Sequence, residues 1–472
     1  MKPTEQSDAF EDDILISKKQ IDDYRKKFGL KRILSGIHLW GIGVGTVIAG
    51  TFFGWNYGLE LSGSLGFFIT TLVVTAFYIV LAFIFSELAG LYPYAGGPYA
   101  YVRKGLGKLG GYLTGVLTIV EFICASAAVT ISIASYVSWV YQSIPKMYVA
   151  LGVYVLFLLI DIIGIKQSAI FQLIITSVAI GALVMFFVGT ADAVNLSEAF
   201  KIEPFVSGAK GIVIAIPYAL WFYLCFEGIA LAAEETVNPK TDMRIGFGTS
   251  IITVALLNFG VLIFCLSTVD WHDLLMNDYP LSSAMHLVNP EGGKWLVIFT
   301  TLAISSLLAS LHGMINGFSR QSFALSRAGY LPKIMSHIHP VTKTPYLAIV
   351  LPGAIGILLA QFGTARILVF AAGFSALLMY LLVILSYLKI KLSARRASHG
   401  WLTKVKAASL VVFAALIFSA LTFISLRTPN SLQIIGVFLG GAMLYYFLIG
   451  RKYIAHDAPE EMEAQNSVIK IH

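Results

Sequence analysis

The chain has 472 residues, of which 57% are hydrophobic and 12% are charged. Soluble domains carry roughly 25% charged residues, so this composition excludes an ordinary soluble protein and predicts one polytopic, all-α membrane domain. The net charge of +7 does not indicate a nucleic-acid partner, because the basic residues gather in alternate loops between apolar segments.

Twelve apolar stretches follow a polar tail of residues 1–32, and we expect each stretch to cross the membrane as a helix. A span needs about 20 apolar residues, and a helix satisfies its own backbone groups in hydrocarbon. The stretches lie near residues 34–57, 65–92, 109–141, 147–163, 168–190, 211–234, 245–268, 294–318, 345–363, 367–388, 405–426 and 431–450. The third is longer than a straight crossing requires, so we expect it to tilt or protrude.

The loops between these spans predict the orientation of the chain. Six of the 33 basic residues lie in odd-numbered loops, and the other 27 lie in the two tails and the even-numbered loops. Because basic residues are enriched on the cytoplasmic side, both termini are predicted to be cytoplasmic. The segment 14–34 is basic and partly amphipathic, which fits a helix on the inner membrane surface and a solvated tail about equally.

Spans one and six are predicted to be broken helices. Residues 41–54 hold five glycines, each of which weakens a helix by roughly 1 kcal/mol relative to alanine. Span six carries Pro217 and then the sequence FEGIA at 226–230. Interruptions at matching positions of two five-span units indicate a transporter site, whereas close packing through small residues is the alternative. The candidate substrate contacts at the two breaks are Ile48, Ala49, Gly50, Thr51, Phe226 and Gly228, with unwinding expected at 48–51 and 225–228.

Two acids lie at membrane depth in spans three and six. Glu121 is 13 residues from Lys108, and Glu227 is 13 residues from Lys240, so each lies roughly 20 Å from its cytoplasmic anchor. A carboxylate at a helix centre costs roughly 2.5–3.5 kcal/mol in hydrocarbon, so it needs a partner, a cavity or a cargo. Glu121 is therefore predicted to hold a small cation. Glu227 fits cation binding and a structural role, as an acceptor for unwound amides, equally well.

The remaining candidates are weaker. The Trp221 ring can attract an ammonium group with about 2 kcal/mol when desolvated, although apolar packing is the commoner role of such a residue. Ser305 and Ser306 could help to bind sodium, and His312 could relay protons, although interhelical hydrogen bonds are the commoner role of each. We interpret Glu87, Glu234, Glu235, Arg320 and Arg327 as fold and gate residues at the cytoplasmic ends. The sequence predicts no catalytic triad, cofactor or metal site, so an enzyme is not expected.

Three segments resemble the amino acid–polyamine–organocation transporters. They are SELAGLYPYAGGPYAY at 86–101, AAEETVNPK at 232–240 and SRQSFALSRAGYLP at 319–332. Within that superfamily, GWNYG at 54–58, IVEF at 119–122 and ALWFYLCFEG at 219–228 resemble bacterial ethanolamine permeases. The resemblance covers roughly residues 34–450.

This resemblance implies a leucine-transporter-type fold and uptake of a small primary amine across a bacterial cytoplasmic membrane. The first five-helix repeat would occupy residues 33–190 and the inverted second repeat residues 191–392. Helices 11 and 12 would follow at 393–450, and a cytoplasmic tail at 451–472. The implied partners are the amine and membrane lipid, whereas the oligomeric state is not indicated.

Two departures from the superfamily bear on mechanism. Amino acid carriers usually show Gly-Ser/Thr-Gly in span one, where bare amides bind the substrate carboxylate, but this chain has Ala49-Gly50-Thr51. Some proton-coupled relatives carry a lysine in span five, and Ala179 falls nearest that position here. Because a protonated amine responds to membrane potential by about 2.3 kcal/mol per 100 mV, the sequence favours potential-driven uniport, with proton or sodium coupling as alternatives.

Other functions are weighed against this prediction. An amino acid or polyamine carrier is the first alternative, because a zwitterion brings its own carboxylate and gains less from Glu121. An amine-sensing receptor is the second, but such proteins usually add a soluble output domain, for which the tails are short. A channel is the third, but it requires a continuous polar stripe, which the sequence lacks.

Overall fold

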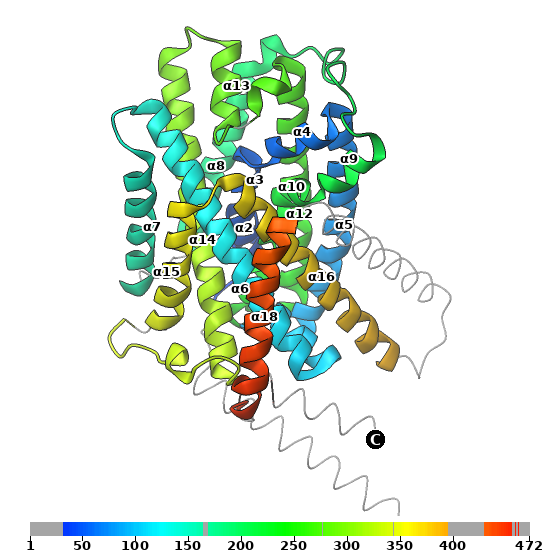
Figure 1. The fold of residues 1–472 in the computed structure, drawn as a ribbon, viewed down its shortest axis with the longest axis vertical. Coiled ribbons are helices and arrows are strands. Elements are labelled where there is room, and N and C mark those ends of the chain that lie inside the picture. Colours follow the sequence, from blue (N-terminus) through cyan, green and yellow to red (C-terminus); the bar gives the residue numbers. More distant parts are fainter. Residues whose placement is uncertain are drawn as a thin grey trace, which may run out of the picture.

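The fold is known from a computed structural model that describes residues 32–163, 169–275, 277–342, 344–394 and 429–455, together with Ala458 and Glu461. Helices run roughly along the long axis of the molecule and form a bundle (Figure 1). The expected amphipathic segment 14–34 and the expected span 405–426 lie wholly or almost wholly outside the described residues.

Nine long helices form most of the described bundle. They are α5 (Ser64–Leu91), α6 (Pro98–Val140), α7 (Lys146–Ile163), α8 (Ala169–Thr190), α12 (Pro239–Thr268), α14 (Gly293–Arg327), α15 (Tyr346–Phe362), α16 (Ala365–Ala394) and α18 (Pro429–Leu448). Among the described residues, seven helices are long and apolar enough to cross a membrane, or eight if a bent pair at the N-terminal end counts as one span. The chain is therefore a multi-pass helical membrane protein, and the expected number of twelve spans stays a prediction.

The first span is bent, but later in the chain than the sequence predicted. It comprises α2 (Gly36–Val47), α3 (Ala49–Phe52), η1 (Trp55–Gly58) and α4 (Leu59–Ser62), with a bend of 53° between Phe52 and Trp55. The bend follows from an extended Phe53 and from Gly54, whose φ of 89° favours glycine. The expected unwinding at 48–51 was wrong, because Ile48 keeps helical angles and donates its N–H to Val44.

The sixth span is broken near its predicted position. It comprises α9 (Gly208–Ile214), α10 (Ile216–Leu220), η3 (Trp221–Tyr223) and α11 (Gly228–Leu231). Leu224 is extended, and Cys225 has a φ of 66°, which a non-glycine residue adopts only where the surroundings impose it. The gap between η3 and α11 leaves backbone amides free to bind other groups.

The ends of the described chain lie on one side of the bundle. Ile33 and Leu34 donate their N–H groups to the Glu235 carbonyl, and Ala455 donates to the Ala328 carbonyl just after α14. We call this side the tail side, and it lies at the bottom of Figure 1. The short helices α4 and α13 (Pro280–Val288) lie at the opposite end.

Helix α6 begins on the tail side with a separate piece. Gly107 has a φ of 86° and divides residues 98–106 from the membrane-spanning part that follows. This N-terminal extension of α6 precedes the expected span 109–141, whose tilt or protrusion stays a prediction. This extension carries Arg103, whose buried guanidinium binds the carboxylate of Glu461.

Candidate functional site

The two interrupted spans meet in the centre of the bundle. A Cβ atom added to Gly50 would lie 2.2 Å from the Trp221 carbonyl oxygen, so the backbones of α3 and η3 are in direct contact. The Trp221 indole N–H donates to the Phe53 carbonyl at 2.8 Å. Thr51 donates to the Asn258 side chain at 2.6 Å, and Asn258 in turn donates to the Phe222 carbonyl at 3.0 Å. The carbonyl groups freed by each break are therefore held by polar groups of the neighbouring spans.

Glu121 reaches this junction from α6. Its side chain is fully buried, and its Oε1 accepts the amide N–H of Cys225 at 3.0 Å. The acid therefore binds an amide that the break in span six leaves free. The structural role that the sequence left open for Glu227 is filled by Glu121.

Glu227 lies beside Glu121 and is also fully buried. Its Oε2 accepts the hydroxyl of Tyr380 from α16 at 2.9 Å, and Tyr380 lies 3.1 Å from the Tyr78 hydroxyl of α5. The structure thus brings together the two acids that the sequence placed at one depth. Two carboxylates at such a short separation repel each other unless a proton or a cation intervenes.

Apart from the contact of the two carboxyl groups with each other, one oxygen of each acid is left without a hydrogen-bond partner. These atoms are Glu121 Oε2 and Glu227 Oε1. Within the described residues, no lysine or arginine forms an ion pair with either carboxylate. A buried carboxylate without a counter-charge is costly, and a cationic ligand can remove that cost.

The amides at the junction of α2 and α3, where the sequence predicted the first break, are already engaged by the protein. Ala49 donates its N–H to Ser310 Oγ at 3.2 Å, and the Thr51 N–H donates to the Ile48 carbonyl at 3.0 Å. Ser310 also donates to the Gly45 carbonyl at 2.7 Å, so α14 holds this turn from outside. The amides of Ala49 and Thr51 are thus not available to an anionic group.

A cavity of about 60 Å³ leads from the second break towards the tail side. Gly228, which directly follows Glu227, lies at one part of its wall. The other lining residues come from α2, α8, α11 and α14: Ile42, Thr46, Gln172, Leu231, Gly313, Asn316, Gly317 and Arg320. The cavity therefore connects the neighbourhood of the acids with the polar end of α14.

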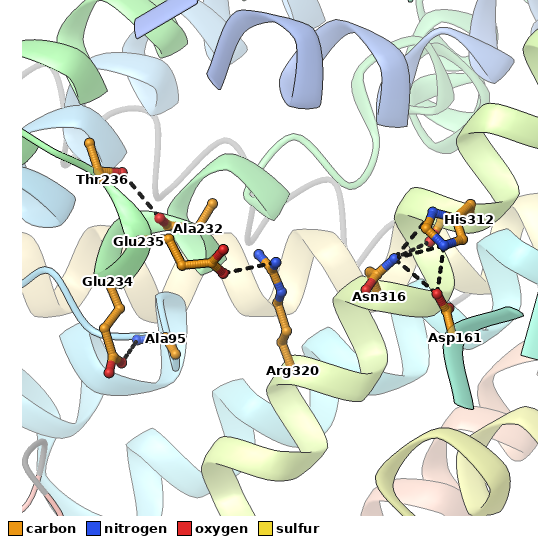
Figure 2. Close-up of polar contacts among 9 residues, drawn as sticks. All are labelled: Ala95, Asp161, Ala232, Glu234, Glu235, Thr236, His312, Asn316 and Arg320. Atoms are coloured by element: carbon orange, nitrogen blue, oxygen red, sulfur yellow. Dashed lines mark hydrogen bonds and ion pairs between the residues drawn. The ribbon is translucent and has the colours of Figure 1, made fainter. Parts of the chain in front are cut away.

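An ion pair lies beside the tail-side end of this cavity. Arg320 pairs with Glu235 at 2.9 Å, and both side chains are partly exposed (Figure 2). The neighbouring Glu234 accepts the amide N–H of Ala95 at 3.0 Å and pairs with Arg327 at 3.8 Å. These contacts join the end of span six to α14 and to the segment just before α6, and the gate role of these residues stays a prediction.

Several predicted site residues lie elsewhere. Ser305 and Ser306 donate to the carbonyls of Thr301 and Leu302 on their own helix, so they do not reach span one. Ser310, about one turn further along α14, makes the contact that was expected of them. Phe226 turns its ring towards Tyr78 of α5 and Phe247 of α12, where it packs edge to face.

Residues that the sequence did not single out complete the site. They are Tyr78, Asn258, Ser310 and Tyr380. Asn258 carries one available signal, because an asparagine is rare within an apolar span. The two tyrosines and Ser310 carry no such signal in a chain this rich in both residue types.

Substituting Gly50 with alanine tests the contact between the two breaks. The added methyl group would meet the backbone of Trp221, which cannot rotate away as a side chain can. We expect a loss of about 1–3 kcal/mol in stability, typical of overpacking, seen as a lower thermal midpoint of the purified protein. Gly248→Ala is the matched control, since nothing lies within 4 Å of its added Cβ. Equal midpoints for the two variants would contradict the contact.

A family model and individual relatives match most of the length of the chain. The family model described as amino acid permease matches residues 38–456. An uncharacterized transporter of Rhizobium meliloti is 31% identical over 330 residues, covering 68% of this chain and 70% of its own length.

Two further relatives have named activities. The vacuolar cationic amino acid transporter 4 of Arabidopsis thaliana is 29% identical, covering 74% of this chain and 62% of its own length. The methylthioribose transporter of Bacillus subtilis is 26% identical, covering 71% of this chain and 76% of its own length. These relatives are transporters with different cargoes.

Proposed function

The chain belongs to the amino acid permease family, and we propose that it carries a small protonated primary amine, ethanolamine, across a membrane by alternating access. The single observation that supports this most strongly is the pair of buried carboxylates, Glu121 and Glu227. Apart from their contact with each other, each has one oxygen without a partner, and the described residues supply no lysine or arginine to neutralise them. An ammonium group offers both the charge and the N–H donors that these oxygens lack.

A free amine suits the site better than an amino acid does. An amino acid would also need donors for its carboxylate, and the family resemblance locates these at the first break. The amides of Ala49 and Thr51 are bound by Ser310 and Ile48 instead. A carboxylate near Glu121 would also be repelled by it. Cationic amino acids remain the alternative to be tested, because the Arabidopsis relative is named for them.

The proposed architecture follows the resemblance. The breaks in spans one and six would be corresponding elements of two inverted repeats, at residues 33–190 and 191–392, as in leucine-transporter-type proteins. The tail side would face the cytoplasm, as the distribution of basic residues predicts. The cavity lined by Gly228 and Arg320 would then open inward, with the ion pair of Arg320 and Glu235 at its mouth.

The proposed role of Trp221 has its own test. Its N–H is committed to the Phe53 carbonyl, so only its ring is available to the ammonium group. Both Trp221→Phe and Trp221→Leu lose this hydrogen bond, but only phenylalanine keeps part of the ring attraction, which is worth about 2 kcal/mol when desolvated. We expect ethanolamine to bind Trp221→Phe more tightly than Trp221→Leu in an equilibrium binding assay. Equal affinities would assign Trp221 a packing role.

Counterflow in proteoliposomes tests the substrate. Vesicles containing the purified protein are loaded with unlabelled ethanolamine and diluted into labelled ethanolamine, and we expect a transient accumulation of label. Unlabelled ethanolamine outside should compete strongly, whereas choline, alanine, arginine and putrescine should compete weakly. Competition by arginine or alanine at the level of ethanolamine would favour an amino acid carrier, and absence of any counterflow would refute amine transport.

A further inference from the structure

A second buried polar cluster lies beside the cavity, away from Glu121 and Glu227. Asp161 of α7 and His312 of α14 form an ion pair with Oδ1 and Nε2 2.6 Å apart, and their side chains are 7% and 4% exposed. Figure 2 shows the pair together with Asn316, one turn further along α14. Asn316 donates from its side chain to Asp161 Oδ1 at 3.3 Å.

This pair lies where packing alone does not require it. Helix α7 is peripheral, since only 17% of its apolar window is buried inside the protein. A peripheral membrane helix packs on its neighbours well with apolar and small side chains. An ionisable side chain buried within a membrane-spanning helix usually marks a functional position, and the Asp161 side chain is only 7% exposed. The second oxygen of Asp161 is buried and lacks a partner.

The pair is connected to the transport route through α14. Asn316 contacts Asp161 and also lines the cavity with Gly313, Gly317 and Arg320. His312 lies one turn before Asn316 on α14. Ser310 lies two residues before His312 and contacts the backbone of span one at Gly45 and Ala49. A change in the interaction of α7 with α14 would therefore affect a helix that both lines the cavity and contacts span one.

We propose that the Asp161–His312 pair is a proton-binding site coupled to amine transport. With a neutral imidazole, the pair carries one buried negative charge on Asp161. Binding one proton to the imidazole converts it to a neutral ion pair, which a low-dielectric surrounding tolerates far better. Loading and unloading of this proton thus changes the attraction between α7 and α14, with no other bond made or broken.

The pair lies beside the cavity through which the amine is proposed to leave. Asn316 places the pair beside the cavity that opens on the tail side, the same cavity that leads from Gly228. In the proposed cycle the proton and the amine are both released on the tail side, which is symport, and antiport would appear in the test below as a failure of the inward proton gradient to drive accumulation. The inference rests on the proposed amine transport and replaces the potential-driven uniport that the sequence favoured.

Other titratable groups on the elements around the pair have separate partners. Glu121 accepts from Cys225, the Tyr154 hydroxyl of α7 lies 2.8 Å from Ser126, and Arg320 pairs with Glu235. Cys124 on α6 is a buried free thiol, and His339 before α15 accepts the Thr342 amide. Among the described residues of α7 and α14, Asp161 and His312 are thus the carboxylate and the imidazole that are in direct contact.

The test measures ethanolamine uptake into proteoliposomes at zero membrane potential. An inward proton gradient of about one pH unit should support about tenfold accumulation of labelled ethanolamine with one proton per amine. Passive diffusion of the neutral base works in the opposite direction, because it concentrates amine in the acidic outer compartment. Asp161→Asn and His312→Gln should lose the gradient-driven accumulation while keeping counterflow and equilibrium binding. His337→Gln, an exposed histidine on the tail side, is the matched control.

The outcomes separate this inference from the proposed function. If the unaltered protein shows no ethanolamine counterflow, amine transport itself is wrong. If it shows counterflow but the gradient drives no accumulation, or if Asp161→Asn keeps the accumulation in full, proton coupling at this pair is wrong. Should both variants fail to fold, proton entry is measured instead, with a pH-sensitive dye inside vesicles that contain the unaltered protein. Alkaline vesicles must acidify when ethanolamine is added outside, and an unchanged signal overturns the inference.

Discussion

Replacing Glu121 with glutamine is expected to weaken ethanolamine binding by about 2–5 kcal/mol, or roughly 30- to 5,000-fold in Kd. The substitution removes the charge that the ammonium group would meet, but it preserves the shape of the side chain. A glutamine oxygen can still accept the Cys225 amide, so the break in span six keeps its partner. Equilibrium binding of labelled ethanolamine to the purified protein measures the loss.

The control for this prediction is Glu198→Gln. Glu198 is exposed and pairs with Lys201 on the surface, so its neutralisation should leave binding unchanged. Glu227→Gln adds a second comparison, because Glu227 keeps its bond from Tyr380 as an amide. If Glu121→Gln binds ethanolamine as tightly as the Glu198 variant does, the acid serves only to hold Cys225.

The depth of the central acids could be predicted from the sequence, but their direction could not. Counting residues from Lys108 and Lys240 placed Glu121 and Glu227 at one level, and the structure places them side by side. Rise per residue fixes the level, whereas the face of a helix depends on how the spans pack. The same count placed Ser305 and Ser306 at this level, but the hydroxyl of each donates to a backbone carbonyl of its own helix.

The glycines of span one illustrate a second limit. Their number predicted a break, and a bend is present, but most of them serve the alternative role of close packing. Gly43 faces Ile229 and Ser250, and Gly45 faces Gln172, each closer than a Cβ atom would allow. Gly54 is the one glycine of this segment with a positive φ, and the bend lies there. A sequence does not distinguish a glycine needed for its backbone angles from one needed for its small size.

Asp161 was missed because its partner is distant in sequence. It lies near the end of its span, where an acid is commonly assigned to the interface, and His312 is 151 positions away. His312 was a candidate for proton transfer, yet a histidine alone did not outweigh its commoner role in the core. The structure shows that His312 of α14 contacts an acid of α7, which the sequence did not indicate.

The second prediction with a large expected effect concerns Glu461 near the C-terminal end. Its fully buried carboxylate accepts from Arg103 Nε at 2.9 Å and from Arg103 Nη2 at 2.6 Å. The hydroxyls of Tyr99 and Tyr330 donate to the same carboxylate at 3.2 and 2.9 Å. Glu461 therefore joins the extension of α6 to the loop after α14.

Glu461→Ala would leave the buried Arg103 guanidinium without its carboxylate, which typically costs about 3–5 kcal/mol. We expect a clearly lower thermal midpoint for this variant. Glu198→Ala breaks an exposed ion pair with Lys201, worth about 0–1 kcal/mol, and should hardly change the midpoint. Removing both buried charges in Arg103→Met with Glu461→Leu should restore most of the stability, because no unpaired charge remains. Equal midpoints for Glu461→Ala and Glu198→Ala would show that the C-terminal segment does not bind there in solution.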